Sequence, residues 1–107
     1  MKNKNSMKLL IITALAEFQK DVLRILKDAE IEAFSSSEID GHKNAGSFIA
    51  AQSWFPGERV GNESMLFFSF TKEELIAPVF ELIKEYNKNL PTNNPVRVAV
   101  VGIEQFI

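Results

Sequence analysis

The feature that most constrains this chain is a pattern that occurs twice: a short apolar run, an amphipathic segment and a second short run. In the first half, the run Leu9–Ile12 precedes the segment 14–30, whose apolar residues recur mostly at spacings of three and four. A weaker run, 31–39, follows. Short apolar runs are typical of strands, and the three-and-four spacing is typical of a helix. The pattern therefore predicts strand, helix and strand over the first 39 residues.

The second half repeats this order. The run MLFFSF, residues 65–70, is aromatic and uncharged, which is typical of a strand. Thr71 begins a T-x-x-E pattern, which predicts that a helix starts there with a capping box. We expect a bend or an irregular first turn at Pro78, and the end of the helix before Pro91. The run VRVAVVGI, residues 96–103, predicts the last strand.

The order of these segments predicts the fold. A chain of 107 residues suits one domain, residues 1–107, in which residues 1–6 form a flexible tail. Right-handed crossovers in two split βαβ units place both helices on one face of a four-stranded antiparallel sheet. We therefore predict an α+β class, ferredoxin-like βαββαβ sandwich. Side chains alternate along a strand, so some aromatic residues of 67–70 face away from the helices, which favours assembly.

One long stretch, residues 38–64, fits neither helix nor strand. It holds four of the five glycines of the chain and its only tryptophan. Loops of this length inside a compact domain are uncommon and are usually functional or disordered. Apolar side chains are costly to expose, so we interpret the stretch as an arm that docks on a partner. Its docking candidates are Phe48, Trp54, Phe55 and Arg59.

Composition excludes several classes of function. The net charge of −2 disfavours nucleic-acid binding, and the absence of cysteine excludes disulfides, thiolate nucleophiles and Cys-ligated zinc. No apolar run is long enough to cross a membrane and no signal peptide is recognisable, so the expected location is the cytoplasm.

The sequence offers few groups for catalysis. His42 is the only histidine; with Glu38 and Asp40 it is a weak candidate for a divalent-metal site, and the alternative is a solvated loop histidine. No nucleophile elbow and no phosphate-binding glycine motif is present. An acylphosphatase-like enzyme would need an arginine-bearing loop where this chain reads ITALAEF, and an RNA-recognition module would need basic and glycine residues around MLFFSF. We therefore expect a protein that is not an enzyme.

Two strings resemble the PII family of signal-transduction proteins. The string DVLRILKDAEIEAFSSSEIDG is similar to the family's first helix and the strand that follows it, and VRVAVVGIEQFI is similar to its last strand. The resemblance covers nearly the whole chain from Met7. It implies a homotrimer of ferredoxin-like subunits in which residues 38–64 are the T-loop between the second and third strands. It also implies a small-molecule sensor that controls a partner protein, such as a membrane transporter or an enzyme.

The chain departs from the family at the nucleotide site. The family's glycine-rich turn before the last strand reads LPTNNPVR here, with Arg97 where the family has a lysine. Gly41 matches the glycine at the base of the T-loop, and the basic residue before the third strand is replaced by Glu63. The resemblance leaves Gly41, Arg97, His42 and Lys43 as ligand-binding candidates. It does not carry over the usual binding of ATP and 2-oxoglutarate, so the effector stays open.

A second resemblance competes with the first. The string SWFPGERVGNES, residues 53–64, is similar to a tryptophan–glycine–charge string of the CutA proteins. That family consists of trimers of the same fold that are linked to divalent-ion tolerance. The resemblance implies a metal-binding trimer, again without catalysis.

Overall fold

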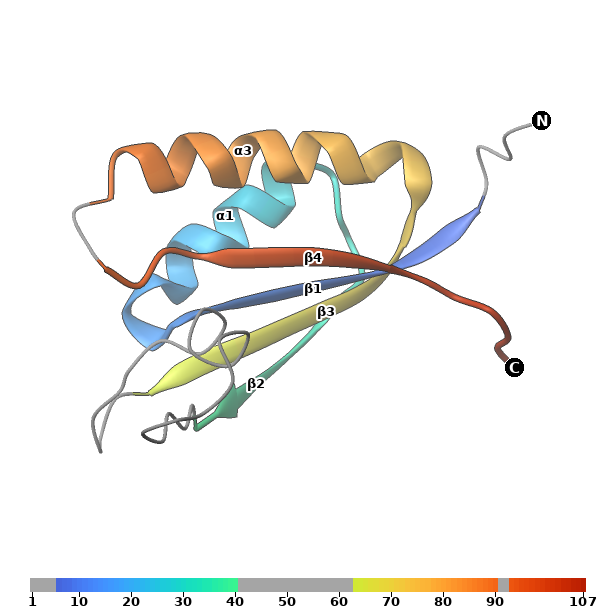
Figure 1. The fold of residues 1–107 in the computed structure, drawn as a ribbon, viewed down its shortest axis with the longest axis horizontal. Coiled ribbons are helices and arrows are strands. Elements are labelled where there is room, and N and C mark those ends of the chain that lie inside the picture. The colour runs from blue at the N-terminus through green and yellow to red at the C-terminus, as the bar shows by residue number, and fades with distance from the viewer. Residues whose placement is uncertain (1–5, 41–62, 91–92) are drawn as a thin grey trace, which may run out of the picture.

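The computed structural model describes residues 6–40, 63–90 and 93–107, which form one sheet covered by two helices (Figure 1). Four strands form the antiparallel sheet in the order β2-β3-β1-β4, and both helices lie on one of its faces. The predicted α+β ferredoxin-like sandwich is therefore confirmed. In chain order the elements are β1 (Met7–Leu15), the 3₁₀ turn η1 (Ala16–Phe18), α1 (Gln19–Asp28), β2 (Ser35–Ile39), β3 (Ser64–Lys72), the 3₁₀ turn η2 (Glu73–Leu75), α3 (Ile76–Lys88) and β4 (Arg97–Gly102).

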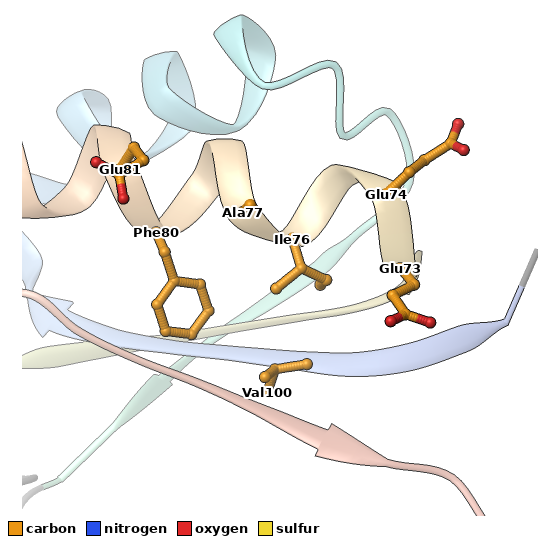
Figure 2. Close-up of a pocket in the computed structure, with 7 residues that line it drawn as sticks. All are labelled: Glu73, Glu74, Ile76, Ala77, Phe80, Glu81 and Val100. Atoms are coloured by element: carbon orange, nitrogen blue, oxygen red, sulfur yellow. The ribbon is translucent and has the colours of Figure 1, made fainter. Parts of the chain in front are cut away.

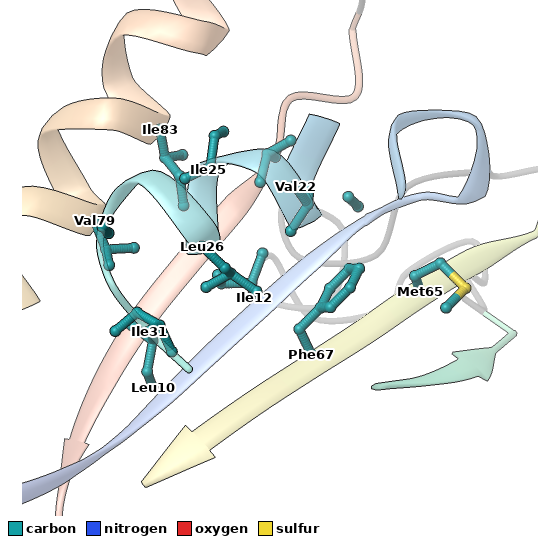
Figure 3. Packing of buried hydrophobic residues seen from close by; sticks show 13 residues of the cluster. Leu10, Ile12, Val22, Ile25, Leu26, Ile31, Met65, Phe67, Val79 and Ile83 are labelled. Atoms are coloured by element: carbon teal, nitrogen blue, oxygen red, sulfur yellow. The ribbon is translucent and has the colours of Figure 1, made fainter. Parts of the chain in front are cut away.

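The core lies between the sheet and the helices (Figure 3). Alternate residues of the central strand β1 point toward the helices, as the period of two requires. On β3, Phe67 occupies the same side, directly opposite Ile12. The helices contribute residues at spacings of three and four, which places them on one stripe. Besides Phe67 and Ile12, the most deeply buried apolar side chains are Leu10, Ala14, Val22, Leu26, Val79, Ile83 and Val96.

The predicted helix start at Thr71 is wrong, because β3 continues through this residue. Met7 pairs with Lys72, so the first residues of β1 hold the last residues of β3 in the sheet. The Thr71 side chain is buried, and its hydroxyl donates a hydrogen bond to Ser69 Oγ at 2.8 Å instead of capping a helix. The helical segment begins at η2, where no side chain caps the N-terminus. Strand pairing thus overrides the local capping signal.

The start of α3 is irregular, as the position of Pro78 predicted. The 3₁₀ turn η2 comes directly before α3, and Pro78 is the third residue of that helix. Proline cannot donate a backbone hydrogen bond, so it is tolerated most easily near a helix start. Its position thus agrees with the 3₁₀ geometry of the preceding turn.

The predicted strand over 31–39 is also partly wrong, because β2 begins only at Ser35. After α1 the chain turns through Glu30, whose φ of 65° lies in the left-handed region. The Ile31 amide then donates to the Leu26 carbonyl at 2.9 Å and the Glu30 amide to the Lys27 carbonyl at 3.0 Å, which are the two hydrogen bonds of a Schellman motif. This turn directs the Ile31 side chain into the core, and the Ser69 hydroxyl donates to the Ala33 carbonyl at 2.6 Å. Residues 31–34 are therefore a fixed connection and not a strand.

A hydrogen bond joins the two helices. The Tyr86 hydroxyl on α3 donates to Asp21 Oδ2 on α1 at 2.5 Å, and the ring of Phe18 meets the Tyr86 ring edge to face, with centroids 6.3 Å apart. Burial first, and then this hydrogen bond, raise the pKa of Tyr86 above its ordinary value of 10.0. The protonated hydroxyl is thus the form that the folded state favours.

We expect Tyr86→Phe to lower the free energy of unfolding by about 1 kcal/mol near neutral pH, because one hydrogen bond to a charged group is lost at a partly exposed site. The pKa of Tyr86 is higher in the folded than in the unfolded state, so this stabilisation is fully present below pH 10 and disappears as pH rises above it. Urea unfolding of both proteins at pH 7 and above pH 10 measures the difference. In an Asp21→Asn background the effect of Tyr86→Phe should shrink. An equal effect in both backgrounds would contradict the assignment.

Candidate functional site

The candidate site lies at the end of the sheet where the stretch 38–64 joins β2 to β3. The predicted bounds of this stretch are slightly too wide, because Glu38 and Ile39 belong to β2 and Ser64 belongs to β3. Ile39, the last residue of β2, pairs directly with Ser64, the first residue of β3. The Glu63 carbonyl accepts a hydrogen bond from the Ala16 amide at 3.0 Å, which ties this point to the end of β1. Both ends of the stretch are therefore held side by side by the sheet. We call these paired ends, Ile39 with Asp40 and Glu63 with Ser64, the arm base.

Most of the residues predicted for the arm lie outside the described residues. Of the metal candidates, Glu38 and Asp40 are described and both side chains are exposed. Within the described ranges, no group of three or more acidic, histidine or cysteine side chains could hold a metal ion. The metal site thus stays a prediction. The candidates outside the described ranges are Gly41, His42, Lys43, Phe48, Trp54, Phe55 and Arg59.

Arg97 lies at the same end of the sheet as the arm base but on the opposite edge. It begins β4 and pairs with Thr13 of β1, and its side chain is half-buried. The strand order places β1 and β3 between β4 and β2 (Figure 1). Neighbouring strands lie about 4.8 Å apart, so about 14 Å of sheet separates the backbone at Arg97 from that of β2. One subunit alone does not bring Arg97 next to the arm base.

Asn87 positions Arg97, although no sequence motif marks it. Its side-chain amide donates to the Val96 carbonyl at 2.9 Å and accepts from the Val96 amide at 3.0 Å. These two hydrogen bonds resemble the pair that two residues exchange across neighbouring strands. They hold the backbone of Val96, next to Arg97, in place. An asparagine in the last turn of a helix carries no sequence signal for this role, because its partner is identified only by the fold.

The sheet face away from the helices is largely apolar. Phe67 points into the core, whereas Phe68 and Phe70 are 37% and 55% exposed and their rings meet edge to face. The predicted split of these aromatics between the two faces is therefore confirmed. The register places further apolar residues of β1 and β4 beside them. We call this surface the open face; it comprises Leu9, Ile11, Leu66, Phe68, Phe70, Ala99 and Val101.

The open face becomes polar near the arm base. Ser64 lies in the row that pairs with Leu15, and Arg97 lies in the neighbouring row with Thr13. The Ser64 hydroxyl is fully buried and, among the described residues, has no hydrogen-bond partner. Buried hydroxyls are almost always paired, so a group bound here would gain a hydrogen bond. Arg97 supplies a positive charge at this end of the sheet and Ser64 an unpaired hydroxyl, but β1 lies between their two strands.

In the part of the chain that is described, the two α-helices are both too short and too polar to cross a membrane.

Comparison with known proteins gives matches among solved structures alone: no family model and no curated protein matches the chain. The apo form of CPII, a nitrogen regulatory PII-like protein from Thiomonas intermedia K12, superposes with a TM-score of 0.63 at 15% identity, over 88% of this chain and 85% of that one. Other structures of CPII contain ADP and AMP with acetate or with bicarbonate.

Two further structures show the same likeness. A PII-like signalling protein from Thermus thermophilus has a TM-score of 0.58 at 16% identity, over 88% of this chain and 83% of that one. A DUF3240 family protein from Shewanella baltica OS155 has a TM-score of 0.63 at 20% identity, over 94% and 93% of the two chains. The chain therefore has the fold of the PII-like proteins, as the sequence resemblance predicted.

Proposed function

We propose that this protein is a non-catalytic regulator of the PII-like type. In this proposal a small molecule binds near the arm base, the stretch 38–64 responds, and the arm docks on or leaves a partner protein such as a membrane transporter. The observation that carries the proposal is the arm base itself. A long, glycine-containing stretch with several large apolar side chains connects two strands that are paired with each other. The fold is one that PII-like proteins share.

A homotrimer is part of this proposal. The open face is a contiguous apolar surface on the side of the sheet that the helices leave uncovered. Large exposed apolar surfaces on soluble domains usually mark interaction sites. Burying this face against other subunits stabilises at roughly 25 cal/mol per Å² of apolar area. The number of subunits comes from the PII resemblance.

The trimer would also complete the ligand site. Arg97 lies on the β4 edge of the sheet and Ile39 lies on the β2 edge, so in this proposal a ligand that contacts both lies between two subunits. Arg97 of one subunit would then supply positive charge beside the arm of its neighbour. Cytoplasmic location follows from the same proposal, because the partner surface of such a regulator faces the cytoplasm. The likeness to PII-like structures favours this regulator over the CutA-like trimer that the sequence left open.

The proposal is tested by a search for the effector. We would measure thermal unfolding with AMP, ADP, ATP, bicarbonate, acetate and divalent metal ions, because a ligand that binds only the folded state raises its stability. A true effector should shift the midpoint in the wild type, shift it less in Arg97→Gln, and change the rate of tryptic cleavage at Arg59. A ligand that stabilises both proteins equally and leaves cleavage unchanged would contradict the proposed site.

For ATP itself we expect weak binding, with a dissociation constant of about 1 mM or higher, equivalent to about −4 kcal/mol. The turn before β4 has no glycine whose backbone amides could approach the phosphates closely, and Glu63 at the arm base adds repulsion. Calorimetric titration with ATP measures the affinity. Submicromolar binding of ATP would contradict this reading of the turn.

A further inference from the structure

The helix side of β4 carries a groove that the proposed regulator does not use (Figure 2). Its volume is about 700 Å³, and it runs between the first turns of α3 and the second half of β4. It lies toward the end of the sheet opposite the arm base, which we call the distal end. The lining residues are Glu73, Glu74, Ile76, Ala77, Phe80, Glu81 and Val100.

The floor of the groove is apolar and only partly covered. Ile76 and Phe80 stand one helical turn apart on α3 and point toward β4, where Val100 faces them (Figure 2). Val100 is 40% exposed, although Leu10 directly opposite is buried in the core. Gly102 is the next residue of β4 on this side, and a Cβ atom there would meet nothing within 4 Å. The groove is therefore open toward the distal end.

The acidic rim of the groove does not select a charged ligand. Glu81 pairs with Lys84 at 3.7 Å, and Glu73 also has a partner. One cation lies beside the open end, because Lys8 is directly opposite Gly102 and its side chain is on the helix side of β1. Lys8 is half-buried and takes part in none of the ion pairs between described residues. An occupant that enters from the distal end thus meets a cation first and the apolar floor second.

The residues that follow β4 carry matching groups. We call residues 103–107 the β4 extension; it runs on beyond the sheet, away from the helices (Figure 1). The side chain of Phe106 is 77% exposed, more than any other aromatic side chain among the described residues. Glu104 is also exposed. In an extended chain Glu104 and Phe106 lie on the same side, and Gln105 lies on the other.

The spacing of these groups agrees with the spacing in the groove. The row of Lys8 and the row of Val100 are two residues apart along the sheet, which is about 6.6 Å. Glu104 and Phe106 are also two residues apart. A β4 extension that lies antiparallel to β4 can therefore pair Glu104 with Lys8 while Phe106 packs on the floor.

The extension of the same chain has too few residues for this position. Glu104 would have to lie beside Gly102, which leaves Ile103 alone to reverse the chain, and the commonest tight hairpin loops contain two residues. A second copy has no such limit. β4 runs toward the distal end, so when two copies meet at their distal ends, the extension of one enters the groove of the other antiparallel to β4. A two-fold axis makes this contact reciprocal.

We propose that two copies of this chain associate at their distal ends by exchanging their β4 extensions. Phe106 of each copy packs on the groove floor of the other, and Glu104 pairs with the other copy's Lys8. The contact uses neither the arm base nor the open face, so it goes beyond the proposed regulator and does not depend on it. Contacts this small are weak, and we expect a dissociation constant on the order of 0.1 mM.

The test uses a spin label that acts between molecules. The chain has no cysteine, so Gln105→Cys is the single site for a nitroxide. This donor protein is mixed with ¹⁵N-labelled wild-type receptor above the expected dissociation constant. We expect broadening of the receptor's amide signals at Ala77, Phe80 and Val100, which a second copy alone can cause. The broadening should persist when both proteins carry Phe68→Asp, a substitution in the open face.

Variants of the receptor separate the groove from the rest of the surface. Ala77→Gln places a longer side chain in the groove and should remove most of the broadening. The matched control is Ala33→Gln, at an exposed alanine outside the groove, and it should leave the broadening unchanged. Lys8→Glu in the receptor should weaken the association about threefold, and Glu104→Lys in the donor should restore it. Circular dichroism of each variant confirms that the fold is intact.

Several results would overturn the proposal. Absence of broadening in the mixture, or equal broadening in the wild type and Ala77→Gln, would remove the groove as the contact. Broadening that appears only when the label and ¹⁵N are in the same chain would assign the groove to the chain's own extension. Failure of Glu104→Lys to restore the association would contradict the antiparallel placement.

Discussion

Phe68→Asp is expected to convert the proposed trimer into a folded monomer. Phe68 lies in the middle of the open face, opposite Ile11 on β1 and Ser35 on β2. Full burial of one phenylalanine is worth about 2 kcal/mol, and Phe68 is 37% exposed in the subunit, so assembly gains about a third of this for each copy. Three copies account for about 2 kcal/mol per trimer, which is more than one order of magnitude in the assembly constant. The buried carboxylates add a further cost. Sedimentation velocity at micromolar concentration measures the change, and circular dichroism reports the fold.

Leu23→Asp provides the matched control. Leu23 is 36% exposed and Phe68 is 37% exposed, so the two substitutions place the same charge at sites of equal exposure in the subunit. Leu23 belongs to α1, outside the open face, and its variant should remain a trimer. A wild-type protein that sediments as a monomer, or two variants that behave alike, would contradict assembly through the open face.

The sequence predicted the fold because its strong signals agree with the tertiary structure. MLFFSF is apolar on both sides of a central strand, and the spacing of Val22, Ile25 and Leu26 puts one stripe of α1 in the core. Thr71 shows the limit of this reasoning. Its T-x-x-E pattern is a valid capping signal, but the pairing of Lys8 with Thr71 extends β3 past it. A local signal cannot reveal how far a partner strand reaches.

The prediction of a strand over residues 31–39 was partly wrong for a related reason. Ile31 and Phe34 look like strand residues, yet Ile31 is drawn into the core by the turn that ends α1, and the Phe34 ring packs against Phe67. Apolar character reports burial, and burial does not require strand pairing. Only five residues from Ser35 onward pair with β3.

The candidate site was predicted unevenly. The position of Arg97 at the start of the last strand, and of the arm base between the second and third strands, followed from the order of the segments. The sheet order places Arg97 on the β4 edge and Ile39 on the β2 edge. This separation cannot be inferred from any single residue. The contact between the Asn87 side chain and the Val96 backbone depends on groups that meet only in the folded chain.

Of all the variants proposed, the one that lacks the arm should show the largest effect, which is on partner binding. We expect a variant in which residues 44–60 are replaced by a short Gly-Ser linker to fold and assemble like the wild type, because Ile39 and Ser64 still pair at the arm base. Shortening a loop lowers its closure entropy by only a small amount, about 0.6 kcal/mol for each halving of length, so stability should change little. The variant should lose its partner completely, because Phe48, Trp54, Phe55 and Arg59 are affected together.

Quantitative pull-down from cells that produce the protein, with and without each candidate effector, measures this loss. The control is Phe106→Ser, which removes an aromatic side chain that is 77% exposed outside the arm and should retain every partner. Loss of the trimer in the arm variant would mean that the stretch serves assembly. If the trimer persists and all partners are still captured, the arm is not the docking element, and the partner must bind another surface.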